Sequence, residues 1–476
     1  MRRMRLRLRR RWSVIPFLRR KRNGPPSPPE PGLRSYPLTW EGGRAQVHLR
    51  LEPEGEATLM VNADRAVRLN PTAALMAWLV LEQVETNEAL GWLQRRFRVD
   101  GSQLESDYAH LRYQIDGLLH PDEFCLIHDL GLDILPPFDK APSAPYRMDL
   151  AITYRCNNDC PHCYNGRPRS FPELETDAWR GILDRLWRVG VPHICFTGGE
   201  ATLRDDLPEL IRHAKELGQI TGLLSNGRRL SDRSYTDRLV EAGLDHIQVT
   251  LESSQPGIHD QMVARRGAWR QTVDGIQNAL TAGLFVMTNT TLLAENCAGL
   301  GETIDFLAGL GVPTVGFNAL IYAGHGESVG TGLAEASLEP LLQLARERTT
   351  SHGLRLIWYT PTQYCHFDPV QMELGVKGCT AAAYNMCVEP DGSVIPCQSY
   401  YESMGNLTTD TWDSIWNHDL ALWLRERRYT PAVCHACPVL SECGGGCPLS
   451  LAQQSPADPL AHVMVPNLAL HEGQDP

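Results

Sequence analysis

The sequence lacks any run of 18 or more apolar residues, so it predicts no membrane-spanning helix. It also lacks a secretory signal, because the apolar stretch inside the basic N-terminus covers only residues 12–18 and contains Pro16. Hydrophobic residues make up 42% of the chain and charged residues 21%, which excludes intrinsic disorder over most of its length. We therefore expect a folded protein of the cytoplasm.

Positive charge is scarce outside the N-terminus. The 476-residue chain has a net charge of −11, although residues 1–22 contain eleven Arg or Lys and no Asp or Glu. Those residues predict a solvated basic tail, or an electrostatic contact with an anionic membrane surface or an acidic peptide. The acidic remainder argues against a nucleic-acid partner, because phosphate binding requires a positive surface.

The length predicts two to four domains. We expect a basic tail with a proline-rich linker over 1–37 and a module of short strands and three helices, similar to a winged helix, over 38–136. A strand–helix repeat follows over 147–350, a cysteine-rich unit over 364–450, and an irregular tail over 451–476. Within the first module, Asn70-Pro71-Thr72 predicts a helix start, since proline is tolerated in a first turn.

The repeat indicates an α/β fold. Strands that alternate with amphipathic helices imply a parallel sheet with right-handed crossovers, and six units are too few for a closed eight-fold barrel. We therefore predict a partial (β/α)6 barrel like an open TIM barrel, with its ligands at the carboxyl ends of the strands. The predicted strands cover 148–153, 193–197, 220–225, 246–251, 285–292 and 314–320.

Fourteen cysteines are many for a chain of this size. Disulfides rarely persist in reducing cytoplasm, so most of these cysteines are better explained as metal ligands. Cys156, Cys160 and Cys163 follow the first barrel strand, where a ligand at the sheet edge is expected. Three thiolates can hold three irons of a 4Fe–4S cluster and leave the fourth open, whereas a structural zinc site is the alternative. Cys125, Cys195 and Cys297 have the character of small buried hydrophobes.

The segment Cys156-Asn-Asn-Asp-Cys160-Pro-His162-Cys163-Tyr164 resembles the cluster loop of the radical S-adenosylmethionine (radical SAM) enzymes, with His162 where that family commonly has an aromatic residue. The resemblance extends over about 180 residues, because companion motifs recur in order at later strand ends. It implies that these side chains bind the S-adenosylmethionine: Gly198, Gly199 and Glu200 near the methionine amino group, Ser225 and Asn226 near the ribose, and Thr250 and Glu252 facing the cofactor. In place of an arginine common in relatives, this chain has Val263, with Arg265 two residues later.

The resemblance implies a mechanism. The open iron chelates the amino and carboxylate groups of S-adenosylmethionine, and one electron from the reduced cluster cleaves the sulfonium C–S bond. The resulting 5′-deoxyadenosyl radical abstracts hydrogen from an unactivated carbon, while the protein supplies position and a dry cavity. An electron donor such as flavodoxin or ferredoxin is therefore an implied partner.

The later cysteines resemble the SPASM extension of peptide-modifying radical enzymes, which holds one or two auxiliary 4Fe–4S clusters. Residues 390–393 predict the turn of a hairpin that presents Cys397. Family analogy assigns Cys379, Cys397 and Cys447 to the first cluster, with Cys387 as a plausible fourth ligand, and Cys434, Cys437 and Cys443 to the second.

The family pattern usually ends with one further cysteine, and this sequence has none after Cys447. The second cluster then borrows Asp458, His462 or Cys365, has an open iron, or is absent. A zinc ribbon on Cys434, Cys437, Cys443 and Cys447 is the structural alternative.

Residues 40–120 resemble the small peptide-binding domain, similar to the peptide chaperone of pyrroloquinoline quinone synthesis, that precedes several of these enzymes. The run from Val67 to Ala74 carries this likeness. Such domains add a leader peptide as a strand to an exposed sheet edge. A DNA-binding winged helix is the alternative, but residues 102–119 contain three acidic side chains against one arginine.

These observations favour a radical SAM enzyme that modifies a ribosomally made peptide with a leader segment at an unactivated C–H position. The same chemistry on a tetrapyrrole or another cofactor precursor is the alternative. A non-catalytic, metal-bound peptide carrier is a third hypothesis, from a different class of function. The sequence assigns no catalytic acid or base.

Overall fold

The computed structural model describes residues 13–14, 27–40, 43–62, 65–119, 142–166 and 172–453. They divide into two compact units, and the first combines the described residues up to 119 with 185–192 and 218–220. Most of the predicted basic tail, residues 454–476 and Cys125 lie outside the described residues.

An antiparallel sheet followed by three helices builds the first unit, as the sequence predicts. The strand order is β1-β2-β3-β4-β5. Alternate side chains of β3, among them Ala45, Val47 and Leu49, are buried in the core. The elements are β1 (Ser13–Val14), β2 (Gly32–Trp40), β3 (Gly43–Leu51), β4 (Ala57–Val61), β5 (Arg65–Leu69), α1 (Pro71–Leu81), α2 (Thr86–Gln94) and α3 (Gly101–Leu119).

Helix α1 begins where the sequence places it. The side chain of Asn70 accepts a hydrogen bond of 2.9 Å from the backbone N–H of Ala73, and Pro71 occupies the first turn. Trp78 of α1 then packs on Trp92 of α2, with ring centroids 5.7 Å apart. The cap therefore fixes the register that turns the apolar face of α1 toward the sheet.

The predicted linker is wrong over residues 32–37, which form the first part of β2. Tyr36 and Leu38 are buried, and Pro37 lies opposite Gln46 of β3. Among the described residues, β1 pairs only with Leu38 and Thr39 of β2, so Pro37 need not donate a hydrogen bond on that side. The linker prediction rested on proline content alone, whereas pairing with β3 makes these residues a strand.

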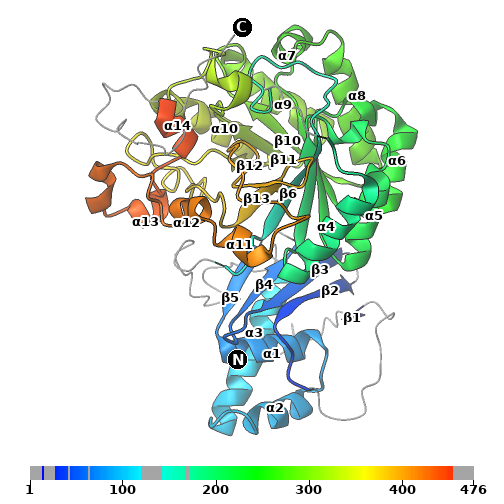
Figure 1. Cartoon of the computed structure of the whole chain (residues 1–476), viewed down its shortest axis with the longest axis vertical. Coiled ribbons are helices and arrows are strands. Elements are labelled where there is room, and N and C mark those ends of the chain that lie inside the picture. The colour runs from blue at the N-terminus through cyan, green and yellow to red at the C-terminus, as the bar shows by residue number, and fades with distance from the viewer. Residues whose placement is uncertain are drawn as a thin grey trace. The chain divides into compact units, whose positions relative to one another are not determined.

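A nine-stranded sheet forms the barrel part of the chain, in the order β12-β11-β10-β9-β8-β7-β6-β13-β14. All six predicted strands are present, and the connecting helices α4, α5, α6 and α8 run along the outer side of the strands (Figure 1). The barrel elements are β6 (Arg147–Thr153), α4 (Thr176–Val189), β7 (His193–Gly198), α5 (Leu207–Leu217), β8 (Ile220–Ser225), α6 (Arg233–Ala242), β9 (His246–Thr250), α7 (Pro256–Met262), α8 (Ala268–Thr281), β10 (Phe285–Thr291), α9 (Leu300–Leu310), β11 (Thr314–Asn318), α10 (Glu339–His352) and β12 (Arg355–Trp358).

The sheet is larger than six strands. Strand β12 continues the parallel run beyond β11, past the predicted barrel end at 350. The cysteine-rich region is not a separate layer either, because its first strand, β13, pairs in parallel with β6 and forms a hairpin with β14. The hairpin turn is the one predicted at 390–393. The remaining elements are β13 (Asn385–Val388), β14 (Val394–Ile395), α11 (Trp412–Trp416), α12 (Asp419–Arg425), α13 (Leu440–Cys443) and α14 (Pro448–Gln453).

Helix α14 occupies the first residues of the predicted irregular tail. Within the described ranges, the helices are too short or too polar for any of them to cross a lipid bilayer.

Candidate active site

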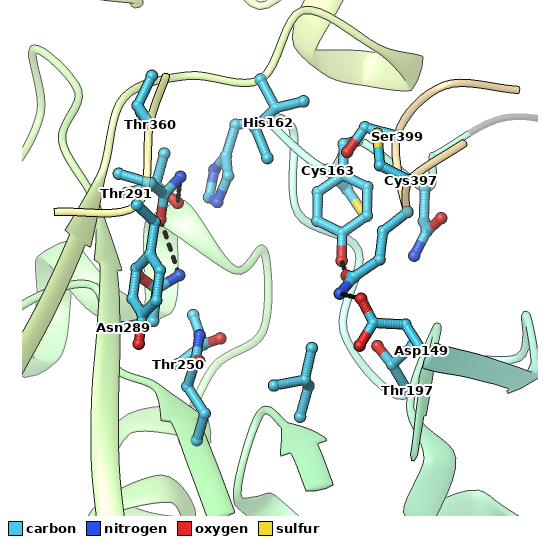
Figure 2. Close-up of a pocket in the computed structure, with 18 of the residues that line it drawn as sticks. Asp149, His162, Cys163, Thr197, Thr250, Asn289, Thr291, Thr360, Cys397 and Ser399 are labelled. Carbon is cyan, nitrogen blue, oxygen red and sulfur yellow. Dashed lines mark hydrogen bonds between the residues drawn. The ribbon is translucent and has the colours of Figure 1, made fainter. Parts of the chain in front are cut away.

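A cavity of about 590 Å³ lies at the carboxyl ends of the barrel strands, the edge at which the sequence predicts ligands. The loop after β6 and the hairpin region after β13 both contribute to its wall. Figure 2 shows Cys163, Cys397 and Asp149 on one side and Asn289 and Thr291 on the other. The cavity therefore brings the two predicted cysteine groups to a single space.

The three cysteines of the first group all line this cavity. The backbone N–H of Asn158 donates to Cys156 Sγ at 3.4 Å, and that of Cys163 donates to the Cys160 carbonyl at 3.1 Å. Burial, against an opposing hydrogen bond from Asn158 and with the charges of Glu200 and Cys163, raises the pKa of the Cys156 thiol to about 11. Three thiols on one short loop favour a cationic partner, so this donor set fits an iron cluster.

Within the described ranges, no three His, Cys, Asp or Glu side chains converge closely enough to share one metal ion. A zinc ion holds its thiolates at about 2.3 Å, which brings the sulfurs close to one another. An iron–sulfur cluster gives each thiolate its own iron. The resemblance of Cys156, Cys160 and Cys163 to the radical SAM cluster loop implies the second arrangement.

Two glycines at the end of β7 let its backbone approach the cluster loop. Gly198 has a φ of +143°, and a Cβ atom there would collide with the carbonyl oxygen of Thr153. A Cβ atom on Gly199 would collide with the carbonyl of Arg155. Both glycines line the cavity, so backbone groups at this turn can face a bound cofactor.

Glu200 follows the glycine turn and connects it to the next strand. Its carboxylate is buried and does not line the cavity. It accepts hydrogen bonds from the hydroxyl of Thr202 at 2.6 Å, the hydroxyl of Ser225 at 2.9 Å and the backbone N–H of Asn226 at 2.8 Å. Glu200 therefore ties the ends of β7 and β8 together, and its place near the methionine amino group stays a prediction.

Ser225 and Asn226 both line the cavity. The amide of Asn226 donates to Asn157 Oδ1 at 2.6 Å, which joins the β8 motif to the cluster loop. The next residue but one, Arg228, donates from Nη1 to Asn158 Oδ1 at 2.9 Å. Arg228 was missed by the sequence analysis, although its position directly after Asn226-Gly227 is a usable signal.

Arg265 is exposed and donates from Nε to the Asn157 carbonyl at 3.1 Å, while Val263 lines the cavity. Arg265 therefore supports the back of the cluster loop rather than the cavity wall. Thr250, at the end of β9, lines the cavity as expected from its place in the sequence.

His162 and Glu252 form a buried pair, with Nε2 and Oε1 3.1 Å apart. Burial alone lowers the pKa of His162, but the hydrogen bond and the charge of Glu252 outweigh it, so that this pKa is raised. The second carboxylate oxygen of Glu252 accepts the backbone N–H of Thr291 at 2.8 Å. The pair therefore fixes the cluster loop to the β9 and β10 ends.

A second ion pair stands at the β6 side of the cavity. Arg147 Nε lies 2.6 Å from Asp149 Oδ1, and Gln398 Nε2 donates to Asp149 Oδ2 at 2.5 Å. The hydroxyl of Tyr164 donates to Gln398 Oε1 at 2.6 Å. These hydrogen bonds link the residue after Cys163 with the residue after Cys397, and no local sequence pattern predicts them because the residues are far apart in the chain.

Tyr401 adds a second link between the same two loops. Its hydroxyl lies 2.7 Å from the Tyr164 carbonyl and 2.6 Å from Asn165 Oδ1. The amide of Asn165 in turn donates to the Gly198 carbonyl at 2.7 Å. We call Tyr401, Asn165 and Gly198 the loop clasp, because they connect the cysteine-rich region to the glycine turn of β7.

The predicted ligands of the first auxiliary cluster are partly brought together. Cys379, Cys397 and Cys447 all line the cavity, and burial together with their mutual charges raises the pKa of Cys379 and of Cys397. Cys387 is buried on β13 in a cluster with Ala151 and Ile395. Its role as a fourth ligand stays a prediction.

The chain matches two family models. Residues 150–307 match the Radical SAM superfamily, and residues 379–438 match SPASM, an iron–sulfur cluster-binding domain. The first matched region contains Cys156, Cys160 and Cys163, and the second contains Cys379 and Cys397, while Cys447 follows the second region.

Two relatives have names that state different activities. One is the Fe-coproporphyrin III synthase of Methanosarcina barkeri, 29% identical over 339 residues that span 64% of this chain and 83% of the relative. The other is the PqqA peptide cyclase of Bradyrhizobium diazoefficiens, 29% identical over 285 residues that span 59% of this chain and 72% of the relative.

The fold is similar to that of a solved structure, Streptococcus suis SuiB bound to its precursor peptide SuiA. The TM-score is 0.65 at 16% identity, and the match covers 87% of this chain and 96% of SuiB. At this identity the likeness concerns the fold.

Proposed function

Because this chain is a radical SAM enzyme that carries a SPASM domain, we propose that it modifies a ribosomally made peptide at an unactivated C–H position. The observation that carries the proposal is the single cavity lined by both cysteine groups. The peptide substrate is the finer part of the proposal, and the following paragraphs give what supports it.

Cys156, Cys160 and Cys163 would hold the 4Fe–4S cluster that binds S-adenosylmethionine, and the turn at Gly198 and Gly199 would face the cofactor. When bound, these groups supply a 5′-deoxyadenosyl radical. The protein's own residues keep the cluster loop in place through Arg228 and Arg265.

The charges of the cavity favour an uncharged segment as substrate. Arg147 pairs with Asp149, and His162 pairs with Glu252, so the charged side chains of the lining neutralise each other. The opposite wall carries amides and hydroxyls, including that of Asn289 (Figure 2). The side-chain amide of Asn289 donates a hydrogen bond to Asn318 Oδ1 at 2.7 Å. Amide side chains can both donate to and accept from a peptide backbone.

A tetrapyrrole precursor is the second candidate, and the similarity to the Fe-coproporphyrin III synthase favours it. A coproporphyrin carries several carboxylates, which arginine or lysine pairs best. The arginine of the cavity lining, Arg147, is already engaged by Asp149 at 2.6 Å. The peptide proposal accounts better for this arrangement.

The first unit supplies a place for a leader segment. Strand β5 pairs with β4 on one side and, among the described residues, has no strand on the other. A peptide added there as a further strand would gain main-chain hydrogen bonds. The PqqA peptide cyclase and SuiB, whose names refer to peptides, are consistent with this proposal.

The proposal also includes an electron donor and a location in the cell. An electron donor such as flavodoxin or ferredoxin would reduce the clusters. Among the described cysteines none forms a disulfide, and we expect the protein to work in the reducing cytoplasm.

The test is co-expression with a short peptide encoded beside this chain, followed by mass spectrometry of the peptide. We expect a mass change that is absent with a variant carrying Cys156→Ala, Cys160→Ala and Cys163→Ala. A peptide deuterated at the modified carbon should transfer deuterium to 5′-deoxyadenosine. If a tetrapyrrole precursor is converted to an iron coproporphyrin and candidate peptides stay unmodified, the second candidate replaces the first.

A further inference from the structure

The second group of late cysteines is one ligand short of a complete cluster site. Cys434 lies in a 3-10 helix (Ala432–Ala436), Cys437 follows it, and Cys443 ends α13. The backbone N–H of Cys437 donates to the Cys434 carbonyl at 2.9 Å, so the three thiols share one short segment. A 4Fe–4S cluster with four protein ligands needs a fourth thiolate or a substitute.

A segment about 80 positions earlier in the sequence passes directly over Cys443. The backbone N–H of Tyr364 donates to Cys443 Sγ at 3.4 Å, and Cys443 Sγ lies 3.7 Å from the Thr362 carbonyl. Cys365 is the next residue along this segment and is exposed. A backbone N–H aimed at a cysteine sulfur is the kind of contact that stabilises a metal-bound thiolate.

The segment around Cys365 is held on both sides. The carboxylate of Glu335 accepts the backbone N–H of Gln363 at 3.0 Å and lies 2.6 Å from His366 Nδ1. Gly446 also packs against this segment, since a Cβ atom there would lie 2.7 Å from Cγ of Gln363. The position of residue 365 beside the cysteine group is therefore fixed by neighbours that are not cysteines.

The electrostatics agree with this geometry. Burial raises the pKa of the Cys365 thiol, and the charges of Cys443 and Cys434 raise it further. Burial likewise raises the pKa of Cys434, followed by the charges of Cys443 and Cys437. Cys443, which the Tyr364 backbone contacts, is the neighbour that Cys365 and Cys434 have in common.

We propose that Cys365 is the fourth ligand of a second auxiliary iron–sulfur cluster, together with Cys434, Cys437 and Cys443. The inference rests on the proposed presence of that cluster and is independent of the identity of the substrate. It replaces the downstream cysteine that this sequence lacks with one that precedes the group by 69 positions.

Cys447 is not available for the same role. It lines the cavity with Cys379 and Cys397, and its charge raises the pKa of both thiols after the larger contribution of burial. The two groups are therefore separate, which argues against a single zinc ribbon on the last four cysteines.

The experiment compares iron and sulfide per chain in the full-length protein, Cys365→Ala, Cys365→Ser and a control, Cys297→Ala, after anaerobic reconstitution. We expect both Cys365 variants to lose between about one and four irons per chain relative to the control, because a missing ligand releases one iron or the cluster. Electron paramagnetic resonance should show a three-iron cluster or the loss of one cluster signal. The conservative serine variant guards against a folding defect.

A variant without Cys434, Cys437 and Cys443 separates the possible failures. If it loses about four irons while the Cys365 variants keep the full content, the cluster exists and Cys365 is not its ligand. If it loses none, or if zinc replaces iron at this group, there is no second cluster and the proposal is overturned. Formation of 5′-deoxyadenosine, measured alongside, reports separately on the proposed function.

Discussion

Two histidines meet at the start of the barrel strands. His193 and His246 begin β7 and β9, with their Nε2 atoms 2.8 Å apart, and the charge of Arg147 acts on His246. Burial and then the charge of Arg147 lower the pKa of His246 to about 4. His246 is therefore neutral at pH 7 and can share one proton with His193.

This histidine predicts a loss of stability in acid. An unfolded histidine titrates near pH 6.5, so below that pH the unfolded chain binds a proton that the folded chain refuses until about pH 4. The resulting loss in the free energy of unfolding is absent above pH 6.5, grows as the pH falls, and reaches about 2 kcal/mol at pH 5. Urea unfolding at pH 7 and pH 5 measures it.

The matched variants are His246→Gln and His110→Gln, the second of which changes an exposed residue of α3. We expect His246→Gln to lose this part of the pH dependence, while His110→Gln keeps it. Equal pH dependence in all three proteins would mean that His246 titrates normally in the folded state.

At the scale of elements, the loop clasp connects two parts of the sequence that carry different cofactors. Tyr401 holds Asn165, and Asn165 holds the carbonyl of Gly198. The cysteine-rich region thereby positions the glycine turn that would face S-adenosylmethionine. Loss of the Tyr401 hydroxyl should therefore lower the affinity for S-adenosylmethionine.

We expect Tyr401→Phe to weaken S-adenosylmethionine binding about 5- to 10-fold, since a hydrogen bond contributes about 1 kcal/mol. Anaerobic calorimetry measures the affinity, and iron content should not change. Tyr400→Phe removes the neighbouring hydroxyl, which does not belong to the clasp, and should bind normally. An unchanged affinity in Tyr401→Phe would show that the clasp does not position the turn.

The sequence predicted those elements whose signal is local. Six barrel strands, the hairpin at 390–393 and the cap at Asn70 follow from alternation and turn chemistry. Strands β12 and β13 were missed because each is only four residues long and is defined by a partner far away in the sequence. Strand pairing of this kind is invisible in a short window.

In the candidate site, too, local patterns located some residues, while contacts between distant residues could not be predicted. Spacing located Cys156, Cys160 and Cys163, because all three come from one loop. Spacing did not reveal the burial of Glu200 behind the turn or the link from Tyr164 to Gln398, which depends on residues 234 positions apart. Such contacts arise from tertiary packing and need the fold.

In the whole molecule, we propose that the first unit captures the peptide and that the barrel carries out the radical chemistry. We expect a chain without residues 1–136 to bind a leader-bearing peptide at least about 10-fold more weakly, because the free edge of β5 is lost. Fluorescence anisotropy with a labelled peptide measures this binding.

The truncated chain should still cleave S-adenosylmethionine without peptide, which controls for an intact barrel. A peptide with a scrambled leader should bind the full chain as weakly as the normal peptide binds the truncated one. If the truncated chain keeps its affinity for the leader, the first unit has another role.

The central claim is that three neighbouring thiolates hold a cluster with one iron left for S-adenosylmethionine. The most direct measurement is the yield of 5′-deoxyadenosine from the reduced, anaerobically reconstituted enzyme, compared with the variant carrying Cys156→Ala, Cys160→Ala and Cys163→Ala. The account predicts product from the enzyme and none from the variant, which keeps the iron of its auxiliary clusters. Equal product from both proteins would contradict it.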